Sequence, residues 1–310
     1  MNHNLVSETK NKPEIFDVII IGGSYSGLSA ALALGRSLRN VIIIDSEKPC
    51  NIQTPHSHNF LTQDGNTPKN ISETAKEQVM KYGTVKFKSG NALNAKKEDF
   101  GFTVKTNSDE VLQAKKLIVA TGLKDIFPAI DGFSDCWGIS ILHCPYCHGY
   151  EVKNLETGII ANGEVGYEFA KMISNWTKKL TVFTNGRSAF SKEQTKKLTS
   201  KNIQIIEKEI LKANHSNGKI ESLQFTDNSK MEIKAVYARP DFEQNCKIPF
   251  DLGCEINDNG LLKVDAFQKT TVPGIYACGD NSSARSLAMA VSTGTMAGVM
   301  ANKELIEEEF

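Results

Sequence analysis

Two cysteines three positions apart, with a histidine directly behind the second, are the residues in this chain best suited to chemistry. The run His-Cys-Pro-Tyr-Cys-His-Gly at 143–149 contains Cys144 and Cys147 in a C-x-x-C pattern, followed by His148. Two thiols at this spacing can close a disulfide and reopen it. An imidazole that titrates near neutral pH can take or give the proton that this exchange needs. The run therefore predicts thiol–disulfide redox chemistry.

A zinc site and a pair of inert cysteines are the alternative interpretations of this run. His143, Cys144, Cys147 and His148 are of types that bind zinc. Adjacent ligands point apart, however, and no second cysteine or histidine cluster completes a tetrahedron, so we predict no metal. The remaining cysteines are expected to be small buried hydrophobes or inert thiols. They are Cys50, Cys136, Cys246, Cys254 and Cys278.

A dinucleotide-binding turn lies about 120 residues before the cysteine pair. Its Gly22 allows a tight turn, and its Gly27 lets a helix pack closely on a strand. The helix start then offers N–H groups to a pyrophosphate. Asp45, which ends the next strand, is suited to bond a ribose hydroxyl. The sequence predicts nucleotide binding by Gly22, Gly23, Ser24, Ser26, Gly27 and Asp45, with Ser24 in place of the usual middle glycine.

A second glycine turn, Gly279-Asp280, lies between an expected strand and a helix near the C-terminal end. An aspartate there commonly caps the helix. Beside the other motifs, we expect it to bond the ribityl chain of a flavin. The helix start that follows could favour negative charge on a reduced flavin ring.

Composition limits the possible classes of protein. The chain has 310 residues, 36 basic and 36 acidic side chains, and 40% apolar residues, which gives no indication of a nucleic-acid partner or a membrane surface. Residues 1–14 are polar without the apolar segment of a signal peptide, and we expect a disordered lead-in. Seven scattered cysteines, an odd number, favour a reducing cytoplasm.

Two βαβ units are predicted from apolar runs. In the first, residues 18–21 and 41–44 are expected to be buried parallel strands, with a helix over 28–38 between them. The second follows the cysteine pair, with strands at 158–161 and 180–183 around a turn and helix. Such units build parallel sheets in α/β proteins.

The order of these units predicts two domains. A helix is expected over about 72–82, and residues 239–250 are expected to be a linker. We predict a discontinuous first domain, 1–124 and 247–310, with a second domain, 125–246, inserted into it.

The motifs together resemble a known family. GGSYSG at 22–27, Asp45, ATG at 120–122, CPYCHG at 144–149 and CGD at 278–280 come in the order found in thioredoxin reductases and their relatives. The similarity spans nearly the whole chain. It implies an α/β fold of two Rossmann-like, three-layer nucleotide-binding domains, with FAD on the first and the redox disulfide on the second. It also implies a homodimer.

The resemblance assigns roles to the redox residues. Cys147 would be the thiol that faces the C4a atom of the flavin. Cys144 would be the interchange thiol that reacts with the substrate. His148 stands where thioredoxin reductases have an acid–base aspartate, and we expect it to act in catalysis with the two cysteines.

The resemblance also assigns flavin contacts. Gln53 falls where the family places a glutamine on the flavin. Arg285-Ser286-Leu287 covers the family's Arg-Gln-Ala, so one flavin contact has changed type. The further cofactor-binding candidates are Ala120, Thr121, Gly122, Gly279, Asp280, Ser286 and Leu287.

The second nucleotide turn departs from thioredoxin reductase. Ala161 replaces the first glycine, and Glu164 brings a carboxylate to the place of a pyrophosphate, which is a like-charge conflict. The family then needs two arginines for the 2′-phosphate of NADPH. Here the next strand ends in Asn185-Gly186 with only Arg187 nearby. We expect NADPH to bind poorly, although a variant binding mode is left open.

The same departures resemble the dithiol oxidases of this family. In that branch FAD and a CxxC pair oxidise small dithiols, such as precursors of gliotoxin or holomycin, and oxygen takes the electrons. The loop Pro55-His56-Ser57-His58 also resembles that branch. Its histidines could line the catalytic site or could simply be solvated.

The sequence therefore predicts an FAD-dependent thiol–disulfide oxidoreductase that oxidises a dithiol substrate, with O2 as the electron acceptor. An NADPH-dependent reductase of thioredoxin or another disulfide is the main alternative. A flavin-bound redox sensor without turnover is a third interpretation. His148 argues against the sensor, because a sensor needs no acid–base group behind its cysteine pair.

Overall fold

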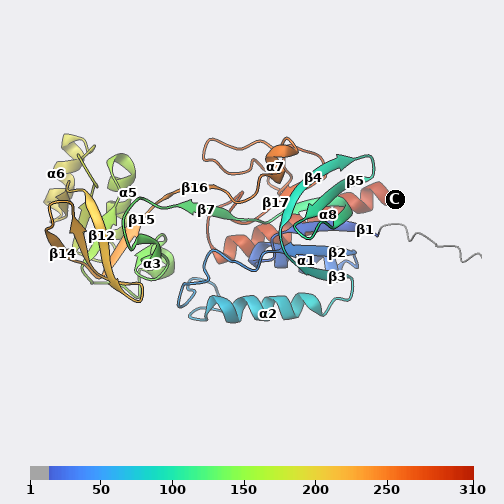
Figure 1. The fold of residues 1–310 in the computed structure, drawn as a ribbon, viewed down its shortest axis with the longest axis horizontal. Helices are drawn as coiled ribbons and strands as arrows, with labels where there is room; N and C mark the ends of the chain where they lie inside the picture. Colours follow the sequence, from blue (N-terminus) through green and yellow to red (C-terminus); the bar gives the residue numbers. More distant parts are fainter. Residues whose placement is uncertain (1–13) are drawn as a thin grey trace, which may run out of the picture. The chain divides into compact units, whose positions relative to one another are not determined.

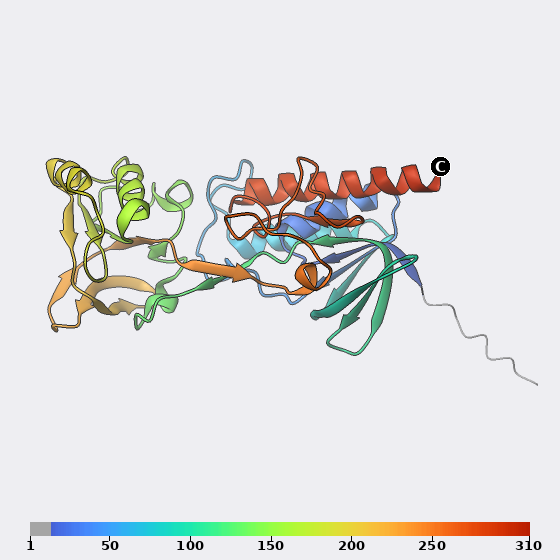
Figure 2. The same cartoon turned by 90° about the horizontal axis from the view of Figure 1, so that it is seen from above.

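The computed structural model describes residues 14–310, which form two compact units (Figures 1 and 2). The lead-in expected at 1–14 falls, but for its last residue, outside the described residues. The first unit contains the described residues up to 49 together with 72–123 and 244–310. The second contains 50–71 and 124–243.

Residues 50–71 group with the second unit by their contacts, whereas the predicted first domain, 1–124 and 247–310, includes them. The segment supplies no strand to the sheet of the first unit. Instead, the Gln53 side-chain amide donates to the carbonyl oxygen of Trp137 at 2.6 Å. His58 lies 3.5 Å from the Glu151 carboxylate. These contacts join residues far apart in the sequence, so no local pattern indicated them.

A seven-stranded sheet forms the centre of the first unit, in the order β3-β2-β1-β6-β5-β4, with β17 also beside β6. Its strands are β1 (Ile15–Ile21), β2 (Val41–Asp45), β3 (Val85–Ser89), β4 (Ala92–Glu98), β5 (Gly101–Thr106), β6 (Val111–Val119) and β17 (Ile275–Ala277). Strands β1, β2, β3, β6 and β17 are parallel, and β4 and β5 run antiparallel. The carboxyl ends of the parallel strands therefore lie along one edge of the sheet.

The helices of the first unit cover a strongly apolar sheet. Its helices are α1 (Tyr25–Arg36), α2 (Pro68–Met80, whose first residues belong to the second unit), α7 (Ile248–Asp251) and α8 (Leu287–Glu309). Figure 2 shows α8 running alongside α1. Glycine makes this approach possible, because a Cβ added to Gly294 would lie 2.1 Å from the Ser26 carbonyl oxygen. Within residues 14–310, no helix is both long and apolar enough to cross a membrane.

The second unit is built on a five-stranded parallel sheet in the order β11-β10-β9-β15-β8, with a three-stranded antiparallel sheet, β12-β13-β14. The strands are β8 (Ile141–Leu142), β9 (Thr157–Ile160), β10 (Leu180–Phe183), β11 (Gln204–Ile206), β12 (Ile210–Ser216), β13 (Lys219–Phe225), β14 (Lys230–Glu232) and β15 (Ala235–Ala238). The helices are α3 (Phe133–Cys136), α4 (Pro145–His148), α5 (Gly163–Ile173) and α6 (Lys192–Ser200). The predicted α/β fold with two Rossmann-like units is confirmed.

Two of the passages between the units are strands that pair with each other, β7 (Leu123–Ile126) and β16 (Asp241–Gln244). The linker predicted at 239–250 is therefore wrong in part, because this segment contains β16 and α7. A short polar strand such as β16 has no apolar alternation of its own. Its backbone hydrogen bonds go to a partner more than a hundred residues away.

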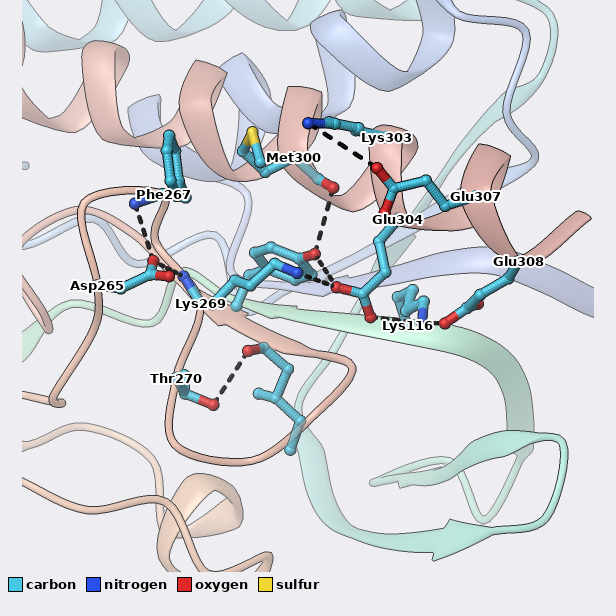
Figure 3. A network of polar contacts seen from close by, with 12 residues as sticks. Lys116, Asp265, Phe267, Lys269, Thr270, Met300, Lys303, Glu304, Glu307 and Glu308 are labelled. Carbon is cyan, nitrogen blue, oxygen red and sulfur yellow. Dashed lines mark hydrogen bonds and ion pairs between the residues drawn. The ribbon is translucent and has the colours of Figure 1, made fainter. Parts of the chain in front are cut away.

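A buried ion network holds α8 against the sheet of the first unit (Figure 3). Lys116 on β6 is only 5% exposed, and its Nζ donates to Glu304 at 2.7 Å and to Glu308. Glu304 also accepts hydrogen bonds from the Tyr276 hydroxyl and from Lys269, each at 2.6 Å. Burial by itself raises the pKa of Glu304. The bonds from the two lysines and Tyr276 outweigh burial and lower that pKa to about 2.

We expect Glu304→Gln to lower the free energy of unfolding at pH 7 by about 2 kcal/mol, because Lys116 loses a charged partner in a buried place. The pKa of Glu304 is depressed in the folded state, so its contribution is complete above the ordinary value of 4.5 and is lost as the pH falls toward about 2. Denaturant unfolding should therefore show that the difference in the free energy of unfolding between wild type and variant becomes smaller from pH 7 to pH 3. Glu307→Gln, which breaks an exposed pair with Lys303, is the control, and an equal loss in both variants would contradict the role of the network.

Candidate redox-active site

The cysteine run follows the short strand β8 and forms one helical turn, α4. Cys144 is the N-cap of this turn and has an extended backbone, with φ −116° and ψ 114°. Pro145 occupies the first helical position, where its fixed φ and missing N–H are tolerated. Because residues three apart share a helix face, the turn brings Cys144 and Cys147 to the same side.

The two cysteine sulfurs lie 2.6 Å apart, with the Cys147 thiol donating to Cys144. Both residues are free thiols and half-buried. A disulfide has a sulfur–sulfur distance of about 2.05 Å, so the pair can close with little movement. The structure thus brings together the two thiols on which the redox prediction depends.

The contact between the thiols shifts both pKa values. The hydrogen bond from Cys147 lowers the pKa of Cys144 to about 7, against the opposing effect of burial. Backbone N–H groups of Tyr146 and Cys147 lower it further. The same hydrogen bond, burial and the charge on Cys144 raise the pKa of Cys147. Near neutral pH the reduced pair therefore carries at most one negative charge, on Cys144.

The half-buried imidazole of His148 directly follows this pair. Burial lowers the pKa of His148 below its usual range. The nearby carboxylate of Glu151 opposes this effect, and the nearby ring of His58 adds to it. His148 is therefore neutral at pH 7 and can accept a proton from a thiol.

The histidine loop meets the cysteine run within the second unit. The His58 ring lies between two carboxylates, with Nδ1 3.7 Å from Asp64 and Nε2 3.5 Å from Glu151. The His56 Nδ1 instead contacts the Gly65 carbonyl oxygen at 3.0 Å, in an exposed position. Of the two loop histidines, His58 is the one beside the groups around His148. Sequence reasoning missed Glu151, because only the packing of the histidine loop shows that this carboxylate lies beside His58.

The first glycine turn has the close backbone approaches that were predicted from its sequence. A Cβ added to Gly22, whose φ is +106°, would lie 2.2 Å from the Ala120 carbonyl oxygen. One added to Gly27 would lie 1.9 Å from the Gly22 carbonyl oxygen. The first turn of α1 is thus fixed beside the ends of β1 and β6. The Ser24 side chain makes no capping hydrogen bond to this turn.

Asp45 lies at the end of β2 against the same turn. One carboxylate oxygen accepts the Gly23 N–H at 3.0 Å, and the other accepts the Glu47 N–H at 3.2 Å. These two backbone donors fix the orientation of the carboxylate. The carboxylate that was predicted to bond a ribose hydroxyl is therefore held next to the turn that was predicted to bind a pyrophosphate.

The remaining candidates of the first unit lie around this turn or begin α8. Ala120-Thr121-Gly122 follows β6 beside Gly22, and a Cβ added to Gly279 would lie 2.5 Å from the Ser26 Oγ. Asp280 is the next residue. Ser286 caps α8 by accepting the Met289 N–H at 3.2 Å, and Leu287 is the first residue of that helix. Gln53 belongs to the second unit, and its flavin contact stays a prediction.

Asn281 is a candidate that sequence reasoning missed. Its side chain is fully buried, and its Nδ2 donates to the Val119 carbonyl oxygen at 3.0 Å. Its Oδ1 has no hydrogen-bond partner among residues 14–310. Buried amide oxygens are normally satisfied. Its place directly after Gly279-Asp280 was the only signal in the sequence.

The second nucleotide turn is occupied by its own side chain. The Asn162 Oδ1 accepts the N–H groups of Gly163 and Ala189, each at 2.8 Å. Its Nδ2 donates to the Arg187 carbonyl oxygen at 2.9 Å. Asn162 thus ties the start of α5 to the segment after β10 and uses an N–H group that a phosphate would need.

Polar side chains around Asn162 also form hydrogen bonds with other residues of the second unit. Glu164 accepts a hydrogen bond from Gln194 at 2.7 Å. Asn185 follows the strand after which thioredoxin reductases need arginines, and its side-chain oxygen accepts the Ile210 N–H at 2.7 Å.

A family model described as pyridine nucleotide-disulphide oxidoreductase matches residues 16–298. The chain belongs to this family. Thioredoxin reductase tcpT of Claviceps purpurea (strain 20.1) is 30% identical over 306 residues, which cover 95% of each chain. The crystal structure of a putative thioredoxin reductase, TrxB from Bacillus anthracis, has a TM-score of 0.91 at 29% identity, covering 95% of this chain and all of that one. The crystal structure of HlmI has a TM-score of 0.89 at 29% identity, with 95% and 94% covered.

Membership of the pyridine nucleotide-disulphide oxidoreductases implies that this chain binds FAD, and the first unit fits that cofactor. The glycine turn leaves no room for side chains at Gly22 and Gly27, so backbone N–H groups can approach a pyrophosphate. Asp45 is held beside that turn, where its predicted contact with a ribose hydroxyl would be made. The unsatisfied oxygen of Asn281 can accept a hydrogen bond from the cofactor.

A prediction follows for the two thiols of this oxidoreductase. Cys147→Ala removes the donor to Cys144, so the pKa of Cys144 should rise from about 7 toward the ordinary thiol range. Alkylation of Cys144 by iodoacetamide at pH 7, followed on its peptide by mass spectrometry, should slow by about tenfold.

Cys147→Ser is the matched control, because its hydroxyl can still donate a hydrogen bond to Cys144. This variant should keep most of the reactivity. Equal alkylation rates in the alanine and serine variants would show that the hydrogen bond does not activate Cys144.

Proposed function

We propose that this protein is an FAD-dependent dithiol oxidase that uses the Cys144–Cys147 disulfide as oxidant and O2 as the final electron acceptor. The observation that carries the proposal is the second nucleotide turn, where Asn162 bonds the N–H group at the start of α5. A turn filled in this way disfavours NADPH as the electron donor, and so supports a dithiol as the source of the electrons. The resemblance of the CPYCHG run to dithiol oxidases supports the same conclusion.

The chain's own residues account for the exchange. A substrate thiolate attacks the Cys144 sulfur, so that a mixed disulfide forms and Cys147 is released as a thiolate. The second substrate thiol then attacks the substrate sulfur of the mixed disulfide, and Cys144 is released. The substrate leaves as a disulfide, and its two electrons now reside on the reduced pair. FAD, when bound, supplies the two-electron acceptor that restores the disulfide.

Two features of the site would assist these steps. A thiol of low pKa is a good leaving group, and the hydrogen bond from Cys147 lowers the pKa of Cys144 to about 7. The neutral His148 would take the proton of the attacking substrate thiol. Glu151 would stabilise the imidazolium that results.

The homodimer and the cytoplasmic location that the sequence predicts remain predictions.

A second candidate function, an NADPH-dependent disulfide reductase, is favoured by the names of the similar proteins. Thioredoxin reductase tcpT and TrxB are both named for that activity. The two functions differ in the electron donor, so they can be tested separately.

Oxygen uptake with dithiothreitol, without nicotinamide, tests the oxidase. We expect steady O2 consumption that Cys144→Ser abolishes. His148→Ala should slow it by roughly 10²–10⁴-fold, the usual contribution of a general base. The flavin spectrum should stay nearly unchanged. His56→Ala, which affects an exposed ring on the Gly65 carbonyl, should have little effect. A rate of oxygen uptake in His148→Ala within about twofold of wild type would show that another residue acts as the base.

Nicotinamide binding tests the reductase. Without two guanidinium contacts to the 2′-phosphate, NADPH should bind roughly 10²-fold or more weakly than at a complete site, and no better than NADH. Titration calorimetry measures both affinities, and stopped-flow absorbance near 450 nm follows flavin reduction. Micromolar NADPH affinity, well above that for NADH, together with rapid bleaching of the flavin would contradict the oxidase function and support the reductase function.

A further inference from the structure

Four side chains with proton or redox chemistry share one face of the helical turn that carries the cysteine pair. They are Cys144, Cys147, His148 and Glu151. The backbone stays helical beyond α4, because Gly149 has φ −65° and ψ −29°, and the Val152 N–H donates to the His148 carbonyl oxygen at 3.4 Å. Residues three or four apart on such a turn are neighbours. The backbone itself therefore places the Glu151 carboxylate beside His148.

The loop that carries His58 is closed by its own backbone. The Ser57 N–H donates to the Asn66 carbonyl oxygen at 2.8 Å, and the Gly65 N–H donates to the Ser57 carbonyl oxygen at 2.9 Å. These two bonds hold the residue next to His58 on both of its backbone sides. The His58 side chain is only 20% exposed. The place of its ring is therefore set by the loop.

The His58 ring lies between two carboxylates. Its Nε2 is 3.5 Å from Glu151, and its Nδ1 is 3.7 Å from Asp64. The Asp64 carboxylate is itself held, because it accepts the Asn59 N–H at 2.7 Å. Only the protonated ring has a hydrogen on both nitrogens and can donate to both carboxylates. Glu151 thus has two imidazole neighbours, His58 on the loop and His148 on its own turn.

The two imidazoles compete for this one carboxylate. Burial lowers the pKa of His148, the Glu151 carboxylate raises it, and the charge on His58 lowers it. A base that already carries a proton cannot accept another, so a carboxylate that faced His148 alone would work against the base. A carboxylate within reach is still useful after the transfer, because it stabilises the imidazolium.

Three other titratable side chains of the site are neutral in the oxidised protein. Cys144 and Cys147 are then joined in an uncharged disulfide. Burial raises the pKa of Tyr237 on β15, so its hydroxyl keeps its proton. Glu151 and His58 are therefore the charged partners that act on His148 together with burial.

We propose that His58 diverts the Glu151 carboxylate from His148 and so keeps the His148 imidazole in the neutral form that accepts a proton. His58 is then a positioning residue, because it acts on His148 through Glu151. No bond forms or breaks in this role. The inference rests on the proposed role of His148 as the base. It gives His58 a function that His56, which contacts the Gly65 carbonyl oxygen, does not share.

The test is the titration of His148 in the oxidised, FAD-loaded protein, followed by NMR of 15N-labelled imidazoles. The loss of one signal in His148→Gln assigns it. His58→Leu removes the donor to Glu151, so the pKa of His148 should rise, and its neutral fraction at pH 6 should fall about two- to fivefold. Above pH 8.5 the signal should match wild type. His58→Gln, which is uncharged but can still donate to Glu151, should shift the titration in the same direction by less.

A double-mutant cycle separates this diversion from a general effect of the loop. Glu151→Gln should lower the pKa of His148, and in that background His58→Leu should have a much smaller effect. His56→Leu changes a neighbouring ring on the same loop and should leave the titration of wild type. An unchanged titration in His58→Leu, a shift to lower pH, or an equal shift with and without the Glu151 carboxylate would overturn the inference.

Oxygen uptake with dithiothreitol gives the second measurement. Relative to wild type, His58→Leu should lose about two- to fivefold of its rate at pH 6 and little at pH 8.5, whereas a purely structural His58 would lower both rates equally. The NMR titration contains no dithiol substrate and no nicotinamide. If wild type consumes no oxygen but the titration shifts as expected, the oxidase proposal fails and the effect of His58 on His148 stands. If oxygen uptake is present and the titration does not shift, only the role of His58 fails.

Discussion

The second unit is organised around one negative charge on two half-buried sulfurs. Burial disfavours that charge, so the protein must supply donors to the sulfur that carries it. The Cys147 thiol and the backbone N–H groups of α4 do so, and they lower the pKa of Cys144 to about 7. The same burial keeps His148 neutral and ready to accept a proton. Partial exclusion of water therefore acts on both groups: it keeps His148 neutral, and it opposes the charge on Cys144, which the donors of α4 restore.

The two nucleotide turns of the chain begin from the same strand–turn–helix pattern and end differently. In the first, glycines at 22 and 27 allow backbone to meet backbone, and the carboxylate of Asp45 is oriented beside the turn. In the second, the side chain of Asn162 bridges the start of α5 and the segment after β10. This side chain uses an N–H group at the start of α5 that a phosphate could otherwise bind. The second unit thus keeps the Rossmann-like architecture while its turn is closed by its own side chain.

The predicted elements were most reliable where burial is complete. The apolar runs of β1 and β2, with the glycine turn between them, were placed correctly because parallel strands covered on both faces need continuous apolar residues. The strands β4 and β16 and the helix α6 were missed. Their sequences are mostly polar and exposed. Strand β16 is defined by its distant partner β7, whereas β4 pairs with the next strand, β5, and α6 begins with a local capping box. Residues 50–71 group with the second unit through contacts to residues far along the chain.

The sequence by itself predicted the chemistry of the site, because a C-x-x-C with an adjacent histidine and a glycine turn before a helix act through local geometry. It also determined the family and the α/β fold. Only the tertiary structure brought His58 to Glu151. Those residues come from distant segments and carry no motif. Their roles depend on burial and on the charges around them, which arise only when the strands and loops pack together.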